Sequence, residues 1–349
     1  MRTFAVAALL ACATAVGAHG SEVRATRFRE NPLITLATSP SIGDNANGPT
    51  VIRVPSWIEH PLGRYYMYFA HHSGRFIRLA YADSLRGPWK IYEPGVLKVE
   101  DTALYRPQPD PIDSPLGAYT HIASPDVYID DAHKRIVLWV HGMWTDGQRW
   151  PERRAEATAW LRQHGYAQFT QVAHSSDGLQ FHVQPAISKQ SYLRVFHYQD
   201  EFYAIARLGQ LLRAKDKDPL SRFELGDSPF RDTPYAGRVR HVALFESGGR
   251  LHVFFTAIGD APEKILYTTI NLSGDWRQWR VGEFTEVLAP AADYECSTLP
   301  IEPSEVGEID RRARQLRDPA VFRENGKTYL FYTFCGEQGV AGAEVTLTP

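Results

Sequence analysis

The sequence has no excess of either charge sign. Its 349 residues include 38 Lys and Arg against 40 Asp and Glu, for a formal net charge of −2. A balance of this kind gives no electrostatic reason to expect a nucleic acid or an acidic membrane surface as partner. Long hydrophobic runs are also missing beyond the first twenty residues, so no later segment is long and apolar enough to span a bilayer. We therefore predict no nucleic-acid partner and no membrane partner.

Cysteine is scarce, and the histidines lack the spacing of a zinc site. The chain has three cysteines, and one of them, Cys12, lies in the N-terminal segment described next. Cys296 and Cys335 remain, and they form either one disulfide between the last inter-repeat loop and the last repeat or two separately buried thiols. No His-x-x-x-His or Cys–His spacing of the kind that binds catalytic zinc is present. We therefore predict no metal site and no required cofactor.

The first twenty residues have the organisation of a secretory signal peptide. They read MRTFAVAALLACATAVGAHG, with a basic start, an apolar run and small residues at the end. The apolar run is too short to anchor the protein in a membrane. We predict that residues 1–20 are removed on export, that the protein is secreted or periplasmic, and that residues 21–349 form a single domain.

The remaining chain repeats one unit five times. Each copy is an apolar strand, a tight polar turn and a second apolar strand rich in aromatic residues, and two further strand-like stretches follow each pair. The copies begin at Pro49, Ser124, Ser191, Arg240 and Asp318. Four short strands per unit, repeated around a ring, are typical of a β-propeller. The sequence predicts an all-β fold, a five-bladed β-propeller with four antiparallel strands in each blade.

The fifth blade lacks its fourth strand at the C-terminus, where AGAEVTLTP ends after the third strand. We expect an N-terminal strand, from the segment NPLITLA that begins at Asn31, to supply it and close the ring. The long insertions all fall on one face of the propeller, and they comprise 94–120, 143–165 with a helix beginning at Pro151, 226–239 and 283–316. Because scaffolds carry binding sites in such loops, we expect the site on that face.

Polar residues gather where the first strand of each blade begins and the second strand ends, at the mouth of the central channel on that face. The set is Asp44, Asn47, His71, His72, Ser124, Asp126, His141, Arg194, Arg240, His241, Glu295, Glu302, Arg317 and Asp318. Buried charges are costly unless they are paired. Some of these residues therefore form structural ion pairs, with Arg194 or Arg317 joined to Asp126 or Asp318. Taken together, the set favours a polar ligand.

Four short motifs resemble those of the five-bladed propeller glycoside hydrolases, the grouping that includes families 43, 32, 68 and 117. Ser124-Pro125-Asp126-Val127 resembles the second-blade Ala-Pro-Asp-Val of family 43, and Asn31-Pro32-Leu33-Ile34 resembles the lead-in to its first blade. Arg317-Asp318-Pro319 resembles the Arg-Asp-Pro of families 32 and 68, and Glu295-Cys296 the Glu-Cys-Pro of family 32, whose glutamate is the acid/base. Asn47-Gly48-Pro49 departs from family 43, which has Asp-Pro with its general base there. The resemblance supports the superfamily and no individual family.

The resemblance implies a secreted glycoside hydrolase. The enclosing loops favour exo-action on a poly- or oligosaccharide. The substrate could be an acidic sugar, or a marine-type sugar of the kind on which family 117 acts. Such enzymes need an acid that protonates the leaving oxygen and a base or nucleophile opposite. We predict Glu295 as general acid, Asp126 as base with Asp44 as second choice, and Asp318 as the orienting and supporting carboxylate. The acid could instead be a histidine, namely His71, His72 or His241.

We expect the other polar residues of the mouth to bind the carbohydrate substrate. We predict contacts from Asn47, His71, His72, Arg194, Arg240, His241, Arg317 and Trp144, with Trp150 as a further stacking platform. The arginines suit a carboxylate or sulfate on the sugar, or they neutralise Asp126 and Asp318. His241 could hold a structural cation or water in the central channel, as in related propellers.

Two other functions are compatible with the same residues. A propeller that binds glycans without cleaving them is favoured by the missing first-blade aspartate. A glycoside phosphorylase would use the arginines and histidines of the mouth to bind phosphate. Two carboxylates that face each other without arginine partners would favour hydrolysis. Acids that are all bonded to arginines would favour binding, and a free Arg–His cluster opposite one acid would favour phosphorolysis.

Overall fold

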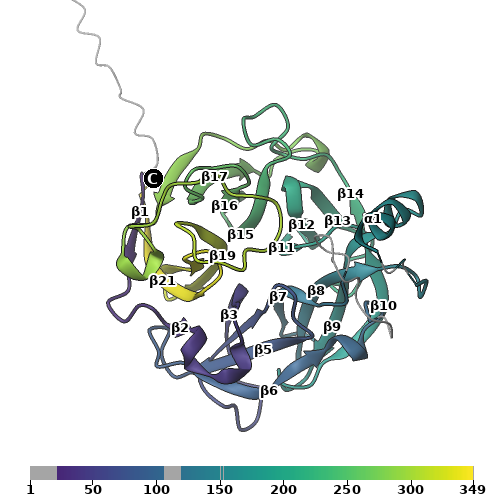
Figure 1. Cartoon of the computed structure of the whole chain (residues 1–349), viewed down its shortest axis with the longest axis horizontal. Coiled ribbons are helices and arrows are strands. Elements are labelled where there is room, and N and C mark those ends of the chain that lie inside the picture. The colour runs from purple at the N-terminus through teal and green to yellow at the C-terminus, as the bar shows by residue number, and fades with distance from the viewer. Residues whose placement is uncertain (1–21, 106–118, 150, 152, 349) are drawn as a thin grey trace, which may run out of the picture.

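The computed structural model describes residues 22–105, 119–149, 151 and 153–348. Its strands form five antiparallel sheets of four strands each, with one short extra strand in the last sheet, and the sheets follow one another around a ring (Figure 1). The predicted five-bladed β-propeller is therefore confirmed. The predicted signal peptide, 1–20, and Trp150 lie outside the described residues.

Each blade is formed by consecutive strands, except the fifth, which takes its outermost strand from the N-terminus. The first blade comprises β3 (Asn47–Arg53), β4 (Tyr65–Ala70), β5 (Phe76–Ala82) and β6 (Lys90–Lys98), and the second β7 (Ala123–Asp130), β8 (Arg135–Trp144), β9 (Ala167–Ser175) and β10 (His182–Ser188). The third comprises β11 (Arg194–Tyr198), β12 (Glu201–Ile205), β13 (Leu211–Ala214) and β14 (Phe223–Leu225). The fourth comprises β15 (Val239–Ser247), β16 (Arg250–Ala257), β17 (Ile265–Asn271) and β18 (Thr285–Leu288), and the fifth β19 (Leu316–Glu324), β20 (Lys327–Phe334), β21 (Gly339–Thr348) and β1 (Glu22–Arg27).

The α-helix α1 (Arg154–Gln163) lies in the insertion between β8 and β9, close to the start expected at Pro151. It packs on the second blade through Ala157 and Leu161, which contact Met143 at the end of β8. Over the described residues, no helix has both the length and the apolar character needed to cross a membrane. Short 3-10 turns shape two loops that matter below, η4 (Arg207–Gly209) and η6 (Asp293–Glu295).

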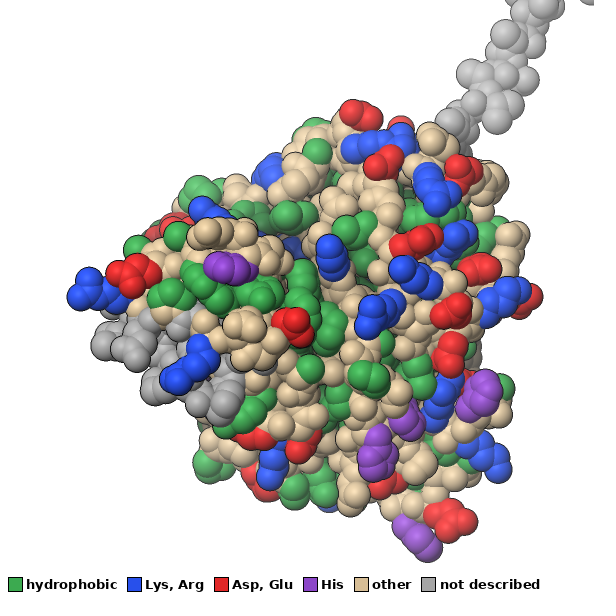
Figure 2. Space-filling view, turned by 90° about the vertical axis from the view of Figure 1, so that its right-hand side faces the viewer, with side chains coloured by type: hydrophobic (Ala, Val, Ile, Leu, Met, Phe, Trp, Pro, Cys, Tyr) green, Lys and Arg blue, Asp and Glu red, His purple; other side chains and the backbone are tan. Residues whose placement is uncertain are grey.

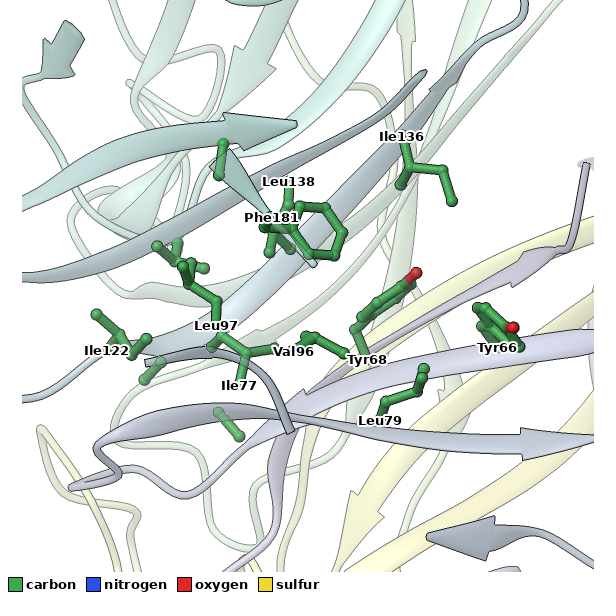
Figure 3. Close-up of a cluster of buried hydrophobic side chains, with 14 of the residues drawn as sticks. Tyr66, Tyr68, Ile77, Leu79, Val96, Leu97, Ile122, Ile136, Leu138 and Phe181 are labelled. Atoms are coloured by element: carbon green, nitrogen blue, oxygen red, sulfur yellow. The ribbon is translucent and has the colours of Figure 1, made fainter. Parts of the chain in front are cut away.

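Neighbouring blades pack through apolar side chains, as Figure 3 shows for the first and second blades. Side chains of β4, β5 and β8 belong to one buried cluster there, among them Tyr66, Tyr68, Ile77, Leu79, Ile136 and Leu138. All six residues of β4, YYMYFA, are buried because other blades cover both faces of the strand. Burying a large apolar side chain stabilises the fold by about 1.5–3 kcal/mol. This explains why the second strand of each repeat is a nearly continuous apolar run.

The ring is closed by an N-terminal strand, but mainly by a different segment from the one expected. Strand β1 pairs antiparallel with β21 over its whole length, from Glu22 opposite Thr348 to Arg27 opposite Ala343. The expected segment contributes only the two-residue β2 (Ile34–Thr35), which meets β21 and then turns into a 3-10 helix. In the sequence EVRATR of β1, successive side chains point to opposite faces of the strand, so that Val23 is buried and Arg24 is exposed.

The first strands of three blades begin with a bulge that aims one residue toward the channel. Gly48, Ser124 and Asp318 have positive φ angles of 58°, 44° and 47°, and each precedes a proline. The pairing register shifts at the same point in β3, β7 and β19. A bulge bends its strand and re-aims a side chain, and positive φ is uncommon outside glycine. The repeated irregularity therefore marks the inner end of the channel wall as the place where side chains converge.

Cys296 and Cys335 form a disulfide, which is one of the two interpretations that the sequence allowed. The bond joins the residue after η6 to the turn after β20, across a sequence separation of 39 residues. A crosslink of this span restricts the unfolded chain and stabilises a fold by about 2–4 kcal/mol. It holds the loop before the fifth blade against that blade.

Candidate active site

A cavity of about 710 Å³ lies at the mouth of the channel, and we call it the mouth cavity. Its lining comes from the β4–β5 loop, the segment before β7, the β8–α1–β9 insertion, the loops around β11 and η4, and the loop before β19. Representative residues are His72, Tyr119, Leu161, Phe169, Tyr192, Arg207 and Glu308. Three of the four long insertions expected on one face contribute to this lining, namely 94–120, 143–165 and 283–316, whereas 226–239 contributes no described lining residue.

His72 is the centre of a buried polar network at the floor of this cavity. Its Nδ1 lies 3.1 Å from Asn47 Nδ2 and 3.2 Å from Glu337 Oε2. Its Nε2 lies 3.3 Å from the Tyr192 hydroxyl. Burial alone would lower the pKa of His72, but the negative charges of Glu337, Glu308 and Asp318 raise that pKa above its ordinary value of 6.5. These negative charges therefore favour the protonated imidazole, which can donate a proton.

Glu337, which the sequence analysis did not single out, anchors this network. It follows β20, and its buried carboxylate accepts hydrogen bonds from Asn45 Nδ2 at 2.6 Å and Arg317 Nη1 at 3.2 Å. Burial would raise the pKa of Glu337, but the positive charges of His72 and Arg317 hold that pKa below its usual range. Glu337 follows the second strand of the fifth blade at the mouth, just as His72 follows the second strand of the first blade. That positional signal could have found it.

Replacing Glu337 by glutamine is expected to lower the pKa of His72, because the main charge that raises it is removed while burial remains. The pKa is measured by NMR titration of the imidazole C–H resonances. Glu308→Gln provides a matched control, since Glu308 is a weaker contributor and should lower the pKa by less. His72 stabilises the fold fully below its unfolded pKa, and this stability is lost as pH rises through the raised folded pKa. An unchanged His72 pKa in Glu337→Gln would contradict the assignment.

Two arginines of the predicted site are neutralised by buried glutamates. Arg240 Nε lies 2.8 Å from Glu263 Oε1, and Arg317 Nε lies 3.3 Å from Glu263 Oε2. Arg317 also pairs with Glu337 at 3.2 Å. Arg240 lines the mouth cavity, while Arg317 is buried beneath its floor. The expectation that these arginines neutralise Asp126 or Asp318 is therefore not met, because Glu263 and Glu337 occupy that role.

Asp126 forms the ion pair with Arg194 that the sequence allowed, but away from the mouth cavity. Its Oδ1 lies 3.4 Å from Arg194 Nη1, and the Val195 backbone N–H donates to Oδ2 at 2.7 Å. Burial is the main cause that raises the pKa of Asp126. The carboxylate borders a separate pocket of about 40 Å³, too small for a sugar, together with Thr50 and Ala243. Neither Asp126 nor Arg194 lines the mouth cavity.

Asp318 lies in the channel beneath Tyr192. Its Oδ1 is 2.7 Å from His241 Nδ1, and Thr333 Oγ1 donates to Oδ2 at 3.0 Å. The Tyr192 ring lies between two imidazoles, with centroid distances of 4.0 Å to His141 and 4.5 Å to His241. Burial would raise the pKa of Asp318, but the neighbouring His241, His72 and Arg317 hold it far below its usual range. Asp318 is thus an ionised carboxylate that supports the floor from below.

Glu295, the expected general acid, lies outside the mouth cavity in a structural ion pair. Its carboxylate is fully buried and accepts hydrogen bonds from Arg27 Nε at 2.7 Å, from the Tyr332 hydroxyl at 2.8 Å and from two backbone N–H groups. Burial would raise the pKa of Glu295, but these donors hold that pKa below 4.5. A general acid must carry a proton and reach the substrate. Because this carboxylate is ionised and enclosed, we no longer assign it that role.

Three other predicted residues also lie away from the lining. Asp44 is exposed, and its Oδ1 lies 2.6 Å from His71 Nε2. Neither residue is among the described side chains that border the mouth cavity. Trp144 packs behind the cavity wall, with its ring centroid 5.5 Å from that of Phe169 and 5.9 Å from that of Tyr166. The predicted platform therefore supports Phe169, which does line the cavity.

The channel residues do not fit a structural cation. Among the residues that the structure describes, no three His, Cys, Asp or Glu side chains group so as to hold a metal ion. Several buried channel atoms have no hydrogen-bond partner within the same described part, namely Ser124 Oγ, both ring nitrogens of His141 and His241 Nε2. Burial lowers the pKa of both histidines. Neutral donors and acceptors of this kind suit bound water, and we derive no step through a metal.

The first-blade position that holds an aspartate in family 43 cannot hold one here. Gly48 approaches the second blade so closely that a Cβ at this position would lie 2.6 Å from Ser124 Cα. A side chain there would require the backbone of one blade to move. The described lining of the mouth cavity contains one carboxylate, that of Glu308, which accepts a hydrogen bond from Ser73 Oγ. Sequence reasoning missed Glu308 because it lies in the middle of a long loop.

The arrangement of blades and channel is that of the glycoside hydrolases of family 43. The structure matches a GH43_1 enzyme from Xanthomonas citri with a TM-score of 0.52 and 12% identity, over 88% of this chain and 89% of that one. It matches the GH43 β-xylosidase/α-arabinofuranosidase CoXyl43, from a compost microbial metagenome, with a TM-score of 0.54 and 13% identity, over 93% and 94%. At these identities the likeness establishes a shared fold. The chain is thus a five-bladed propeller with the same fold as these family 43 enzymes.

No protein-family model matches the sequence. The chain belongs to the family of the uncharacterized protein R118 of Acanthamoeba polyphaga mimivirus. The two are 33% identical over 365 residues, which cover 98% of this chain and 95% of that protein. The relationship therefore covers nearly the whole length of both proteins.

Proposed function

We propose that this protein is a glycoside hydrolase in which His72 is the general acid and Glu308 the general base. The observation that carries the proposal is that His72, whose pKa is raised by the neighbouring Glu337, lines the same cavity as Glu308. In the reaction, His72 Nε2–H protonates the glycosidic oxygen as its bond to the anomeric carbon breaks. A water molecule forms the new bond to that carbon and gives its proton to Glu308.

Other residues support this chemistry without reacting. Burial raises the pKa of Tyr192, so its hydroxyl stays protonated beside His72 Nε2 and can guide the sugar oxygen by hydrogen bonding. Asp318 contributes negative charge that favours the imidazolium. The wall formed by α1 and the loop before β19 encloses the cavity, which suits action at a chain end. Export by the N-terminal segment would give the enzyme access to extracellular glycans.

The proposal is tested by incubating the protein with a panel of plant and algal oligosaccharides and measuring released sugars. Glu308→Gln is expected to lower kcat by about 10²- to 10⁴-fold, because the water loses its proton acceptor. Glu305→Gln is the matched control, since its exposed side chain lies in the same loop but does not line the cavity. Full activity of folded Glu308→Gln, or wild-type protein that cleaves nothing in the panel, would contradict the hydrolase assignment.

A glycoside phosphorylase is the second candidate, because the described lining combines a single acid with cations that have no partner among the described residues. Arg162, Lys189 and Arg207 line the cavity together with Glu308. The same panel run with and without inorganic phosphate separates the two activities. Cleavage that requires phosphate and yields a sugar phosphate identifies a phosphorylase. Glycan binding without cleavage in either condition identifies a binding propeller.

A further inference from the structure

Three cationic side chains of the mouth cavity have no partner within the described part of the chain. They come from three separate elements: Arg162 from the last turn of α1, Lys189 from the loop between β10 and β11, and Arg207 from η4. No ion pair or side-chain hydrogen bond joins any of them to another described residue. The single described carboxylate of the lining, Glu308, cannot balance three positive charges.

This excess of positive charge is a local feature of the cavity. On the face shown in Figure 2, acidic and basic side chains are interspersed. Deeper in the mouth, Arg240 and Arg317 are paired with buried glutamates at 2.8 and 3.2 Å. Grouped cations repel one another unless an anion joins them. The three unpaired side chains therefore differ from the other arginines of the site, whose charges the fold already balances.

Arg207 is bonded through its backbone to the segment that carries Tyr192. Arg207 and Tyr192 both line the mouth cavity, and the positive charge of Arg207 opposes the rise in the Tyr192 pKa that burial causes. The Arg207 backbone N–H donates to the Ser191 carbonyl at 3.0 Å, next to Tyr192 itself. The following residue, Leu208, has a positive φ of 64°, and strained backbone of this kind persists where the surrounding structure fixes it. Lys189 and Arg162 are exposed at the rim.

Part of the lining is apolar and fits the carbon face of a sugar. Leu161, Phe169 and Met143 form it, from α1 and strands β8 and β9. The volume of about 710 Å³ is in the range of sites that enclose a small organic ligand. An inorganic anion alone would leave these apolar side chains without a partner. A ring that carries an anionic group would contact both the apolar and the cationic residues of the lining.

We infer that the mouth cavity selects an acidic sugar of the uronic acid class, whose carboxylate is bound by Arg207 with Lys189 and Arg162 at the rim. The inference rests on the proposed function, since it names the substrate class of the same cavity. A guanidinium binds a carboxylate through two parallel hydrogen bonds. The carboxylate is held beside Tyr192, so the glycosidic oxygen of the terminal residue comes near His72.

The test is calorimetric binding of D-glucuronate and D-galacturonate against D-glucose and D-galactose, which involves no cleavage. The wild type is expected to bind the uronates more tightly than the matched neutral sugars. Arg207→Met is expected to weaken uronate binding by about 10- to 100-fold, the effect of losing a hydrogen bond to a charged group. Arg222→Met is the matched control, because this arginine of the same blade is exposed and outside the lining.

Equal affinity for uronates and neutral sugars, or uronate binding unchanged in folded Arg207→Met, would overturn the inference. Arg207-dependent binding of inorganic phosphate without uronate binding would also overturn it, and would assign the cations to a phosphate co-substrate. Different outcomes would contradict the proposed function and the inference about its substrate. If uronates bind through Arg207 and no glycan is cleaved, the binding inference stands alone. If neutral glycans are cleaved and uronates do not bind, only the inference is lost.

Discussion

Replacing His72 by asparagine is expected to lower glycan cleavage by about 10²- to 10⁴-fold, because the leaving oxygen loses its proton donor. His72 is the described histidine whose pKa is raised while it also lines the mouth cavity. The measurement is kcat on an oligosaccharide that the wild type cleaves. Thermal unfolding of the variant is recorded alongside, since the side chain is buried and its loss also affects stability. Rates are then compared at a temperature where both proteins are folded.

His71→Asn is the informative comparison, since the two histidines are adjacent in sequence and lie in different surroundings. His71 bonds to the exposed Asp44 at 2.6 Å, whereas His72 contacts the buried Glu337. We expect His72→Asn to lose glycan cleavage and His71→Asn to retain it. Loss of cleavage in His71→Asn with retention in His72→Asn would exclude our choice of acid. The pH profile gives an independent check: activity that needs the imidazolium must fall as pH rises through the raised pKa of His72.

The fold was predictable because its signals are local. Apolar strands, tight polar turns and aromatic second strands recur five times, and each repeat carries its own periodicity. The register of ring closure is a different kind of property, because it joins strands from opposite ends of the chain. Strand β1 and segment NPLITLA both carry apolar residues, and only the length of pairing with β21 distinguishes them. The local sequence patterns of β1 and NPLITLA do not reveal over how many residues each segment pairs with β21.

The candidate site was predictable in its location and only partly in its residues. His72, Asn47 and Arg240 were found because they lie at strand ends near the channel. Glu337 and Glu263 occupy the same kind of position and were passed over, although the rule applied to them. Glu308 and Arg207 lie in loops whose path depends on packing between blades, which no repeat pattern encodes. Long-range placement in loops is therefore what sequence reasoning lacked.

The Glu295-Cys296 motif shows how a short resemblance can lead to the wrong partner. The motif suggested an acid/base glutamate, yet Arg27, which pairs with Glu295, is 268 residues away in sequence. A motif of two residues states nothing about such a partner. The structure brings them together because β1 completes the fifth blade beside the loop that contains η6. A carboxylate at this seam is bonded on every side and contributes to the closure of the ring.

Glu295→Ala is accordingly expected to lower the free energy of unfolding by about 3–5 kcal/mol, the cost of leaving a buried charge partner unpaired. The variant leaves the Arg27 guanidinium and the Tyr332 hydroxyl without the carboxylate to which both donate hydrogen bonds. Stability is measured by denaturant unfolding. The double variant Arg27→Met/Glu295→Ala should cost less than the sum of the two single variants, because the pair acts as a unit.

The stability that the Arg27–Glu295 ion pair contributes depends on pH in a defined direction. The donors lower the pKa of Glu295 in the folded protein below 4.5, so the pair stabilises the fold above the unfolded pKa, and this contribution is lost as pH falls through the folded pKa. Glu295→Ala should therefore remove stability at neutral pH and lose less on acidification than the wild type. A Glu295→Gln variant that unfolds like the wild type but no longer cleaves glycans would refute the structural role and restore the glutamate as the acid. A variant that is less stable and still active while folded places Glu295 in ring closure, with proton donation left to His72.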